Sequence, residues 1–236
     1  MLSELEAVPF RSYFSYFLTW SLLYWTTIKT SASDSVLVAI VAARSLYKRD
    51  HPDTKLEDLV IYTTTQTHSL GSKAGLVLGI QVRAIEVSHD DQLALRGEAL
   101  RDALEEDIKI GLKPFILSNV FFLTLEVHSM LLTLKLTSCN CWNHFFRCSR
   151  QHVWDKGSWY ERLQIFIYSI FLIHSLVKCY PWLWVHVDAA WAGSALCCPE
   201  YRDKLYLKEI NAFAHSFCTN FHKVCDVVTY ISATIE

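Results

Sequence analysis

Apolar and polar residues follow regular patterns in two parts of the chain, residues 31–117 and 181–223. Short runs rich in Val, Ile, Leu and Tyr predict buried strands over residues 58–62, 81–86 and 113–117. Apolar residues at helical spacing predict helices over residues 36–48, 69–78 and 96–109. Because strands and helices alternate with short links, we expect right-handed βαβ units, a mostly parallel sheet and the α/β fold class.

Local signals indicate where these helices begin and end. Ser33 or Asp34 is the expected N-cap of the first helix, and Gly79 is expected to end the second. The third helix is expected to end at Gly111, and its charged residues are interpreted as a solvent-exposed face. Free backbone N–H groups and the helix dipole make the start of the first helix a candidate phosphate site.

The most informative stretch is Trp182-Leu-Trp-Val-His-Val-Asp-Ala-Ala-Trp-Ala-Gly-Ser194. Its first half predicts a buried strand that ends at Asp188. Ligands of open α/β sheets bind outside the carboxyl ends of the strands, so this position suits a residue with a chemical role. The small residues that follow would let a flat group approach closely. Further along, Lys223 directly follows His222.

Composition excludes some classes of partner and favours a reducing compartment. The net charge of −2 indicates neither a nucleic acid nor an anionic membrane surface as partner. The eight cysteines all follow position 138 and form no small-scaffold disulfide framework. Cys197, Cys198 and Cys218 are therefore interpreted as buried free thiols of a cytoplasmic protein.

Two further interpretations concern the less ordered stretches. Five clustered residues are candidate zinc ligands: Cys139, Cys141, His144, Cys148 and His152. Their spacing matches no common zinc finger, so no metal site is predicted. The apolar run over residues 10–28 contains many polar residues, and the run over residues 163–177 is shorter than the roughly 20 residues that span a bilayer. A membrane anchor is therefore not favoured.

The segments His186-Val-Asp-Ala-Ala-Trp-Ala-Gly-Ser194 and Ser216-Phe-Cys-Thr-Asn-Phe-His-Lys223 resemble the pyridoxal-phosphate-dependent group II decarboxylases. That family includes aromatic-L-amino-acid, tyrosine and glutamate decarboxylases, and the similarity is strongest to the aromatic branch. Ser31-Ala-Ser-Asp34 and Gln66-Thr-His-Ser69 resemble two further family segments. The resemblance implies part of the large domain of the type I, aspartate-aminotransferase-like fold, pyridoxal 5'-phosphate as cofactor, an amino-acid substrate and a homodimer.

The resemblance also implies a role for each residue that matches a family motif. Lys223 would bind the cofactor aldehyde covalently, Asp188 would pair with the pyridine nitrogen, and His68 would stack on the ring. Ala190 would pack against the other face of the ring. Four residues would hold the cofactor phosphate: Ala32, Ser33, Asn220 and His222.

Several family features have no counterpart in the chain. Val224 stands where the family usually has a tryptophan, and the threonine-bearing strand end after Leu117 is absent. The N-terminal substrate-binding segment and the C-terminal small domain with its mobile loop are also absent. We therefore expect weak or no decarboxylation from this chain alone, and the residues that would select the amino acid are not in it.

Two hypotheses follow. The first is an amino-acid decarboxylase that produces the amine and carbon dioxide, present as a fragment or a faulty gene product. In it, residues 1–30, 118–180 and 224–236 are divergent, non-family sequence such as translated intron. The second is a non-catalytic, membrane-associated protein that retains decarboxylase segments. Under the first, His68, Asp188 and Lys223 should converge on one pocket of a single α/β sheet.

Overall fold

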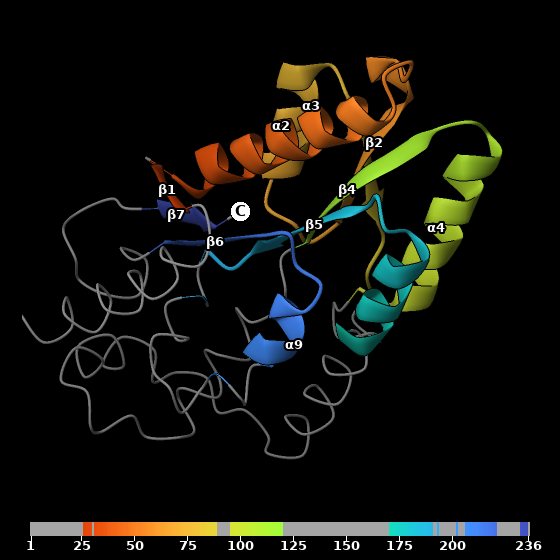
Figure 1. Cartoon of the computed structure of the whole chain (residues 1–236). Coiled ribbons are helices and arrows are strands. Elements are labelled where there is room, and N and C mark those ends of the chain that lie inside the picture. The colour runs from red at the N-terminus through yellow and green to blue at the C-terminus, as the bar shows by residue number, and fades with distance from the viewer. Residues whose placement is uncertain are drawn as a thin grey trace, which may run out of the picture.

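The computed structural model describes residues 26–29, 31–88, 95–119, 170–190, 193, 202, 206–220 and 232–235. Its strands are β1 (Thr26–Lys29), β2 (Leu59–Thr64), β3 (Gln81–Ile85), β4 (Lys113–Asn119), β5 (Trp184–Asp188), β6 (Ser216–Asn220) and β7 (Ser232–Ile235). In this described part they form a seven-stranded sheet in the order β1-β7-β6-β5-β4-β2-β3 (Figure 1).

Most of this sheet is parallel. The strands from β3 through β2, β4 and β5 to β6 all pair in parallel with their neighbours. The strand β7 pairs antiparallel with β6, and β1 pairs antiparallel with β7 at the edge. The expected α/β class with a mostly parallel sheet is confirmed. The strand β7 lies in the tail that the sequence analysis assigned to divergent sequence.

Helices cover both faces of the sheet. They are α2 (Ala32–Asp50), α3 (Leu70–Leu78), α4 (Gly97–Lys109) and α9 (Leu207–Asn211), with a 3-10 turn η1 (Leu56–Asp58) and a helix over residues 170–179. Figure 1 shows α2 and α3 on one face, and α4, the 170–179 helix and α9 on the other. Each face carries its own cluster of buried apolar side chains.

The sequence of β2 explains its central place. All six of its residues are buried, as expected for a parallel strand that is covered on both faces. Leu59 and Ile61 pack into the cluster beneath α2 and α3, whereas Val60 and Tyr62 pack into the cluster beneath α4. An almost continuous apolar run is therefore needed here, and the sequence supplies it.

Two glycines let α3 lie close to the sheet. A Cβ atom on Gly71 would come within 2.5 Å of Thr63 Cγ2, and one on Gly75 would collide with the Val82 side chain. The helix ends as predicted at Gly79, which adopts the left-handed conformation with φ 67°. This close packing fixes the turn between β2 and α3 at the carboxyl end of β2.

The helix over residues 170–179 belongs to the stretch expected to be a divergent insert. It connects to β5 and packs into the core through Ile170, Ile173 and Val177. A Cβ atom on Gly97 would lie 2.5 Å from Leu172 Cβ, so α4 begins in close contact with this helix. Among the described residues, no helix has both the length and the apolar character needed to cross a membrane.

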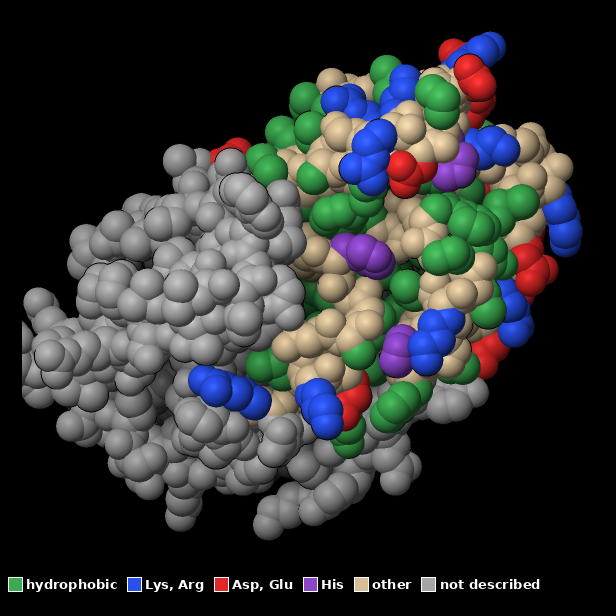
Figure 2. Space-filling view, in the orientation of Figure 1, with side chains coloured by type: hydrophobic (Ala, Val, Ile, Leu, Met, Phe, Trp, Pro, Cys, Tyr) green, Lys and Arg blue, Asp and Glu red, His purple; other side chains and the backbone are tan. Residues whose placement is uncertain are grey.

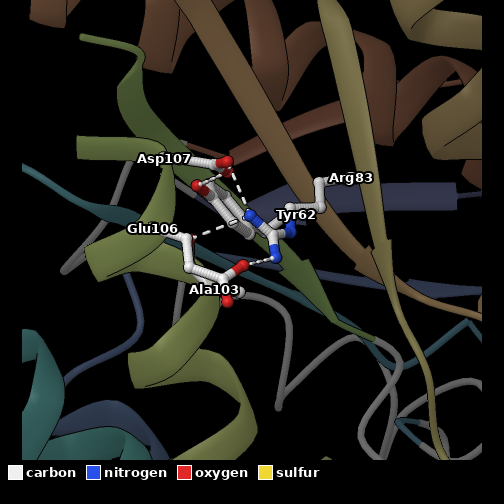
Figure 3. Close-up of polar contacts among 5 residues, drawn as sticks. All are labelled: Tyr62, Arg83, Ala103, Glu106 and Asp107. Carbon is white, nitrogen blue, oxygen red and sulfur yellow. Dashed lines mark hydrogen bonds and ion pairs between the residues drawn. The ribbon is translucent and has the colours of Figure 1, made fainter. Parts of the chain in front are cut away.

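The charged face of α4 differs from the expectation that it is solvent-exposed throughout. Asp107 is buried, because Tyr62 and Arg83 reach it from β2 and β3 (Figure 3). The Tyr62 hydroxyl donates to Asp107 Oδ2, and Arg83 Nη1 donates to Asp107 Oδ1 at 2.6 Å. Burial and this hydrogen bond raise the pKa of Tyr62. The interpretation of Asp107 as a solvated residue was therefore wrong.

The same guanidinium also binds the surface of α4. Arg83 Nη2 donates to Glu106 Oε2 at 2.5 Å, and Nη1 donates to the Ala103 carbonyl at 3.2 Å. The Glu106 side chain is 65% exposed and the Asp107 side chain only 7% exposed. Removing the Asp107 carboxylate should therefore lower the free energy of unfolding more than removing the Glu106 carboxylate.

We expect Asp107→Ala to lower the free energy of unfolding by about 3–5 kcal/mol, because it leaves the buried Tyr62 hydroxyl without its acceptor and removes the buried carboxylate that binds Arg83. Glu106→Ala on the same helix should cost at most about 1 kcal/mol, since water screens that ion pair. Urea unfolding of both variants followed by circular dichroism measures the difference. Equal losses would contradict the assignment of Asp107 as the buried anchor of α4.

Candidate functional site

The carboxyl ends of the parallel strands carry the candidate site. From β2 the chain crosses to β3 on one side, and all later crossovers run the other way through β4, β5 and β6. The direction in which the chain adds strands to the sheet therefore reverses between β2 and β4. Ligands of open α/β sheets bind outside the carboxyl ends of the strands at such a point. Asp188 ends β5 and Asn220 ends β6, both at this edge.

Asp188 is a buried carboxylate held by neutral groups. Its Oδ1 atom accepts a hydrogen bond from the Ala190 backbone N–H at 3.0 Å and a weaker one from Cys218 Sγ at 3.4 Å. In the described part of the chain, no lysine or arginine forms an ion pair with it. A buried carboxylate with only neutral donors favours a positively charged group beside it.

Backbone hydrogen bonds join the ends of β5 and β6. The Ala189 N–H donates to the Cys218 carbonyl at 3.0 Å, and the Asn220 N–H donates to the Ala190 carbonyl at 3.2 Å. Ala190 also shares an apolar cluster with Ala32 and Cys218. The structure thus brings together four of the predicted site residues: Ala32, Asp188, Ala190 and Asn220.

The N-terminus of α2 meets the sheet at this edge. Its N-cap is Ser31, not Ser33 or Asp34, because Ser31 has extended backbone angles and its Oγ accepts the Asp34 N–H at 3.2 Å. Ser33 is exposed in the first turn, while Ala32 is buried. The backbone N–H groups and the positive end of the helix dipole lie at this first turn.

His68 lies in the turn that follows β2. It is exposed, and its carbonyl accepts the Leu70 N–H at 2.6 Å. Within the described part of the chain no hydrogen bond joins His68 to Asp188, since β4 separates β2 from β5. The expected convergence with Lys223 stays a prediction, because His222 and Lys223 lie outside the described residues. The candidate zinc ligands from Cys139 to His152 also lie outside them.

Sequence reasoning missed a buried polar row on β5 and β6. Trp184 Nε1 donates to Ser216 Oγ at 2.7 Å, and the same oxygen is 2.7 Å from His186 Nδ1. Burial lowers the pKa of His186 to about 4, although the charge of Asp188 acts in the opposite direction. The signal was the period-2 alternation, which places His186 and Asp188 on one face of β5.

Close packing against β6 accounts for the glycine at position 193. A Cβ atom there would lie 2.5 Å from Thr219 Oγ1 and 2.7 Å from Thr219 Cβ. The glycine therefore lets the turn after β5 pack directly on β6. Cys218 is a buried thiol outside any disulfide bond, as predicted, while Cys197 and Cys198 lie outside the described residues.

Comparison with known proteins identifies the family. The sequence model described as "Pyridoxal-dependent decarboxylase conserved domain" matches residues 22–126 and 173–235, which is most of the chain. The chain therefore belongs to the pyridoxal-dependent decarboxylase family, whose members act on amino acids with pyridoxal phosphate as cofactor.

Individual relatives agree with this assignment. The chain is 34% identical over 204 residues to aromatic-L-amino-acid decarboxylase of Rattus norvegicus, covering 83% of this chain and 33% of that protein. It is 32% identical over 201 residues to phenylacetaldehyde synthase of Arabidopsis thaliana, covering 83% of this chain and 32% of that protein. The chain thus spans about a third of the length of these relatives.

A solved structure confirms the fold. The chain superposes on tryptophan decarboxylase of Catharanthus roseus in complex with L-tryptophan with a TM-score of 0.62 at 23% identity. The superposition covers 89% of this chain and 36% of that one. The family match also extends into residues 22–30, 118–126, 173–180 and 224–235, which were expected to be divergent. Non-family sequence remains a proposal for residues outside the match.

We expect Gly193→Ala to destabilise the protein by about 1–3 kcal/mol, since the new methyl group must displace Thr219. Adding Thr219→Ala should restore part of the loss, because it removes Oγ1, the nearer of the two atoms that the methyl group would meet, and leaves Cβ in place. Thermal unfolding of the parent, both single variants and the double variant measures the coupling. Additive losses in the double variant would show that the two residues are not in close contact.

Proposed function

We propose that this chain is the cofactor-binding part of a pyridoxal-phosphate-dependent decarboxylase that converts an aromatic amino acid to its amine and carbon dioxide. The observation that carries the proposal is the buried carboxylate of Asp188 at the carboxyl end of β5, which is held by neutral donors. The homodimer and the cytoplasmic location implied by the sequence resemblance belong to the same proposal.

The residues around Asp188 fit pyridoxal 5'-phosphate. A protonated pyridine nitrogen would supply the positive charge that the described residues do not place beside this carboxylate. The carboxylate would in turn hold the proton on that nitrogen. When bound, the cofactor supplies an electron-accepting ring that stabilises the carbanion left by departing carbon dioxide. The fixed Oδ1 atom leaves Oδ2 to face the ligand.

Neighbouring residues would position the rest of the cofactor. Ala190 is small and buried, so a flat ring would pack against it. The capped N-terminus of α2, with Ala32 and Ser33, would bind the phosphate through backbone N–H groups and the serine hydroxyl. Asn220 would add an amide donor from the end of β6.

Three further roles follow from the sequence resemblance. His68 would stack on the ring from the turn after β2, where its exposed side chain has room to move. His222 would bind the phosphate. Lys223 would bind the cofactor covalently and be displaced by the substrate amine. These two residues follow Asn220 in the sequence after one intervening residue, Phe221.

The aromatic substrate is supported by the names of the relatives alone. The rat relative is an aromatic-L-amino-acid decarboxylase, and the Catharanthus roseus structure contains L-tryptophan. The Arabidopsis thaliana relative is named for an aldehyde product, so product analysis must separate an amine from an aldehyde.

We expect Asp188→Asn and Lys223→Ala to fail in different ways in a titration with pyridoxal 5'-phosphate. Asp188→Asn removes the charge that favours the protonated pyridine nitrogen, so it should weaken binding about tenfold or more with little loss of stability. Lys223→Ala should lose the visible absorbance band that borohydride removes, while its phosphate site still binds the cofactor noncovalently. Absorbance and thermal unfolding measure both effects.

Asp102→Asn and Lys208→Ala are matched controls, since both side chains are exposed on helices away from the strand ends. They should bind the cofactor like the parent protein. A Lys223→Ala variant with the same borohydride-sensitive band as the parent would remove Lys223 from its role. Unchanged affinity in Asp188→Asn would remove Asp188.

A further inference from the structure

A cavity of about 590 Å³ lies at the amino ends of the parallel strands, at the opposite edge of the sheet from Asp188 and Asn220. Its walls come from the end of α2, the end of α4, the start of β4 and the residues that lead into β5. On the face seen in Figure 2, hydrophobic side chains gather between α2 and α4. Cavities of about 300–1,000 Å³ are the usual size of small-molecule sites in proteins.

Two pairs of aromatic side chains line this cavity. Trp182 is 42% exposed, and its ring meets the ring of Tyr180 edge to face with centroids 5.7 Å apart. Tyr47 is buried and stacks on His51 with centroids 4.4 Å apart. Ile108 adds an apolar side chain that is 41% exposed. A flat aromatic ring packed here would remove this apolar surface from water.

Charged groups of both signs border the same cavity. Glu105 and Lys109 lie one turn apart on α4, and Lys113 begins β4. All three are exposed, and no ion pair engages them within the described part of the chain. Burial raises the pKa of Tyr180 and the charge of Glu105 raises it further, so this carboxylate lies near the aromatic wall.

The balance of these charges decides which class of ligand fits. The helices α2 and α4 both end at the cavity, so each brings the negative end of its dipole there. Together with Glu105 these dipoles disfavour a polyanion such as a nucleotide. The two lysines in turn disfavour a ligand whose only charge is an ammonium group. A molecule that carries one carboxylate and one ammonium group satisfies both signs.

A smaller hollow of about 80 Å³ adjoins the cavity and shares Tyr47, His51 and Trp182 with it. A carbonyl can only accept, so His51 Nδ1 donates to the Tyr47 carbonyl at 3.1 Å, and Nε2 of the neutral ring is an acceptor. His215 also lines the hollow, and its Nδ1 accepts the Val185 N–H at 3.0 Å, so its neutral ring carries the proton on Nε2. The hollow therefore suits a ring hydroxyl or N–H group.

We propose that this cavity binds a free aromatic amino acid, with its ring against Trp182, its ammonium group at Glu105 and its carboxylate at the two lysines. A free amino acid is required because both of its charged groups are consumed in the amide bonds of a peptide. The ligand class follows from the lining of the cavity, and the cavity lies at the other edge of the sheet from Asp188. The proposal therefore does not depend on the proposed function.

The first test is equilibrium dialysis of the full chain, without cofactor, against radiolabelled L-tryptophan. We expect a dissociation constant of about 1 mM or lower for the parent. Trp182→Ala should weaken binding about tenfold, because the ligand ring loses its aromatic contact. Phe171→Ala is the matched control, since Phe171 is 49% exposed and does not line the cavity. No saturable binding by the parent, or equal affinity in Trp182→Ala, would overturn the proposal.

The second test uses ligands that each lack one charged group. Lys113→Ala should weaken the binding of L-tryptophan and indole-3-propionate about two- to fivefold, but not that of tryptamine, which has no carboxylate. Glu105→Gln should weaken L-tryptophan and tryptamine, but not indole-3-propionate, which has no ammonium group. Lys73→Ala and Asp102→Asn remove exposed charges outside the cavity and are the matched controls. Equal effects of each variant on all three ligands would contradict the assigned positions.

The last test separates this cavity from the cofactor site. L-Tryptophan should raise the midpoint of thermal unfolding of the parent and of Asp188→Asn alike, but not that of Trp182→Ala. The reverse pattern would place the ligand in the cofactor site, so this proposal would be wrong while the proposed function stands. Equal binding of N-acetyl-L-tryptophanamide would point to an aromatic residue of a protein segment and overturn the free amino acid. A parent that does not bind pyridoxal 5'-phosphate would contradict only the proposed function.

Discussion

A buried carboxylate without a cation is the constraint on which the site depends. Removing a carboxylate from water is costly unless charges or hydrogen bonds compensate for it. Asp188 has two neutral donors in the described structure, Ala190 N–H and the Cys218 thiol. The nearby His186 is held neutral by its own burial. These features leave a negative charge that a ligand with a protonated nitrogen would compensate.

The fold makes this arrangement possible. Parallel pairing brings the ends of β5 and β6 together, so the residues after Asp188 and Cys218 form hydrogen bonds with one another. The close contact of Gly193 with Thr219 holds the turn on β6. On the other face, Asp107 joins α4 to Tyr62 on β2 and Arg83 on β3 (Figure 3). On the face of the molecule seen in Figure 2, charges of both signs are scattered over the described residues without a single basic region.

The sequence predicted the elements whose signals are local. The apolar run of β2, the glycine that ends α3 and the strand that ends at Asp188 were all correctly inferred. Features that depend on contacts distant in sequence were missed. Asp107 stands in a charged run that is typical of a solvent-exposed helix face. Its burial is explained only by its contacts with Tyr62 on β2 and Arg83 on β3. The N-cap was misplaced by two or three residues, because several adjacent residues have capping side chains and backbone geometry selects Ser31.

The candidate site divides in the same way. Ala32, Asp188, Ala190 and Asn220 were predicted from motifs, and the structure brings them together. The supporting row of Trp184, His186 and Ser216 was not predicted, since a histidine within an apolar strand has no sequence signature that reveals its partner. The role of Gly193 likewise depends on Thr219, which lies on another strand.

The protonation state of the bound cofactor tests the central claim most directly. Pyridoxal 5'-phosphate labelled with ¹⁵N in the ring would be bound to the full chain, and its nitrogen shift measured as the pH is raised. The buried charge of Asp188 predicts that the pyridine nitrogen stays protonated at a pH where the free cofactor has lost that proton. A bound cofactor whose nitrogen loses its proton at the same pH as the free cofactor would contradict this account.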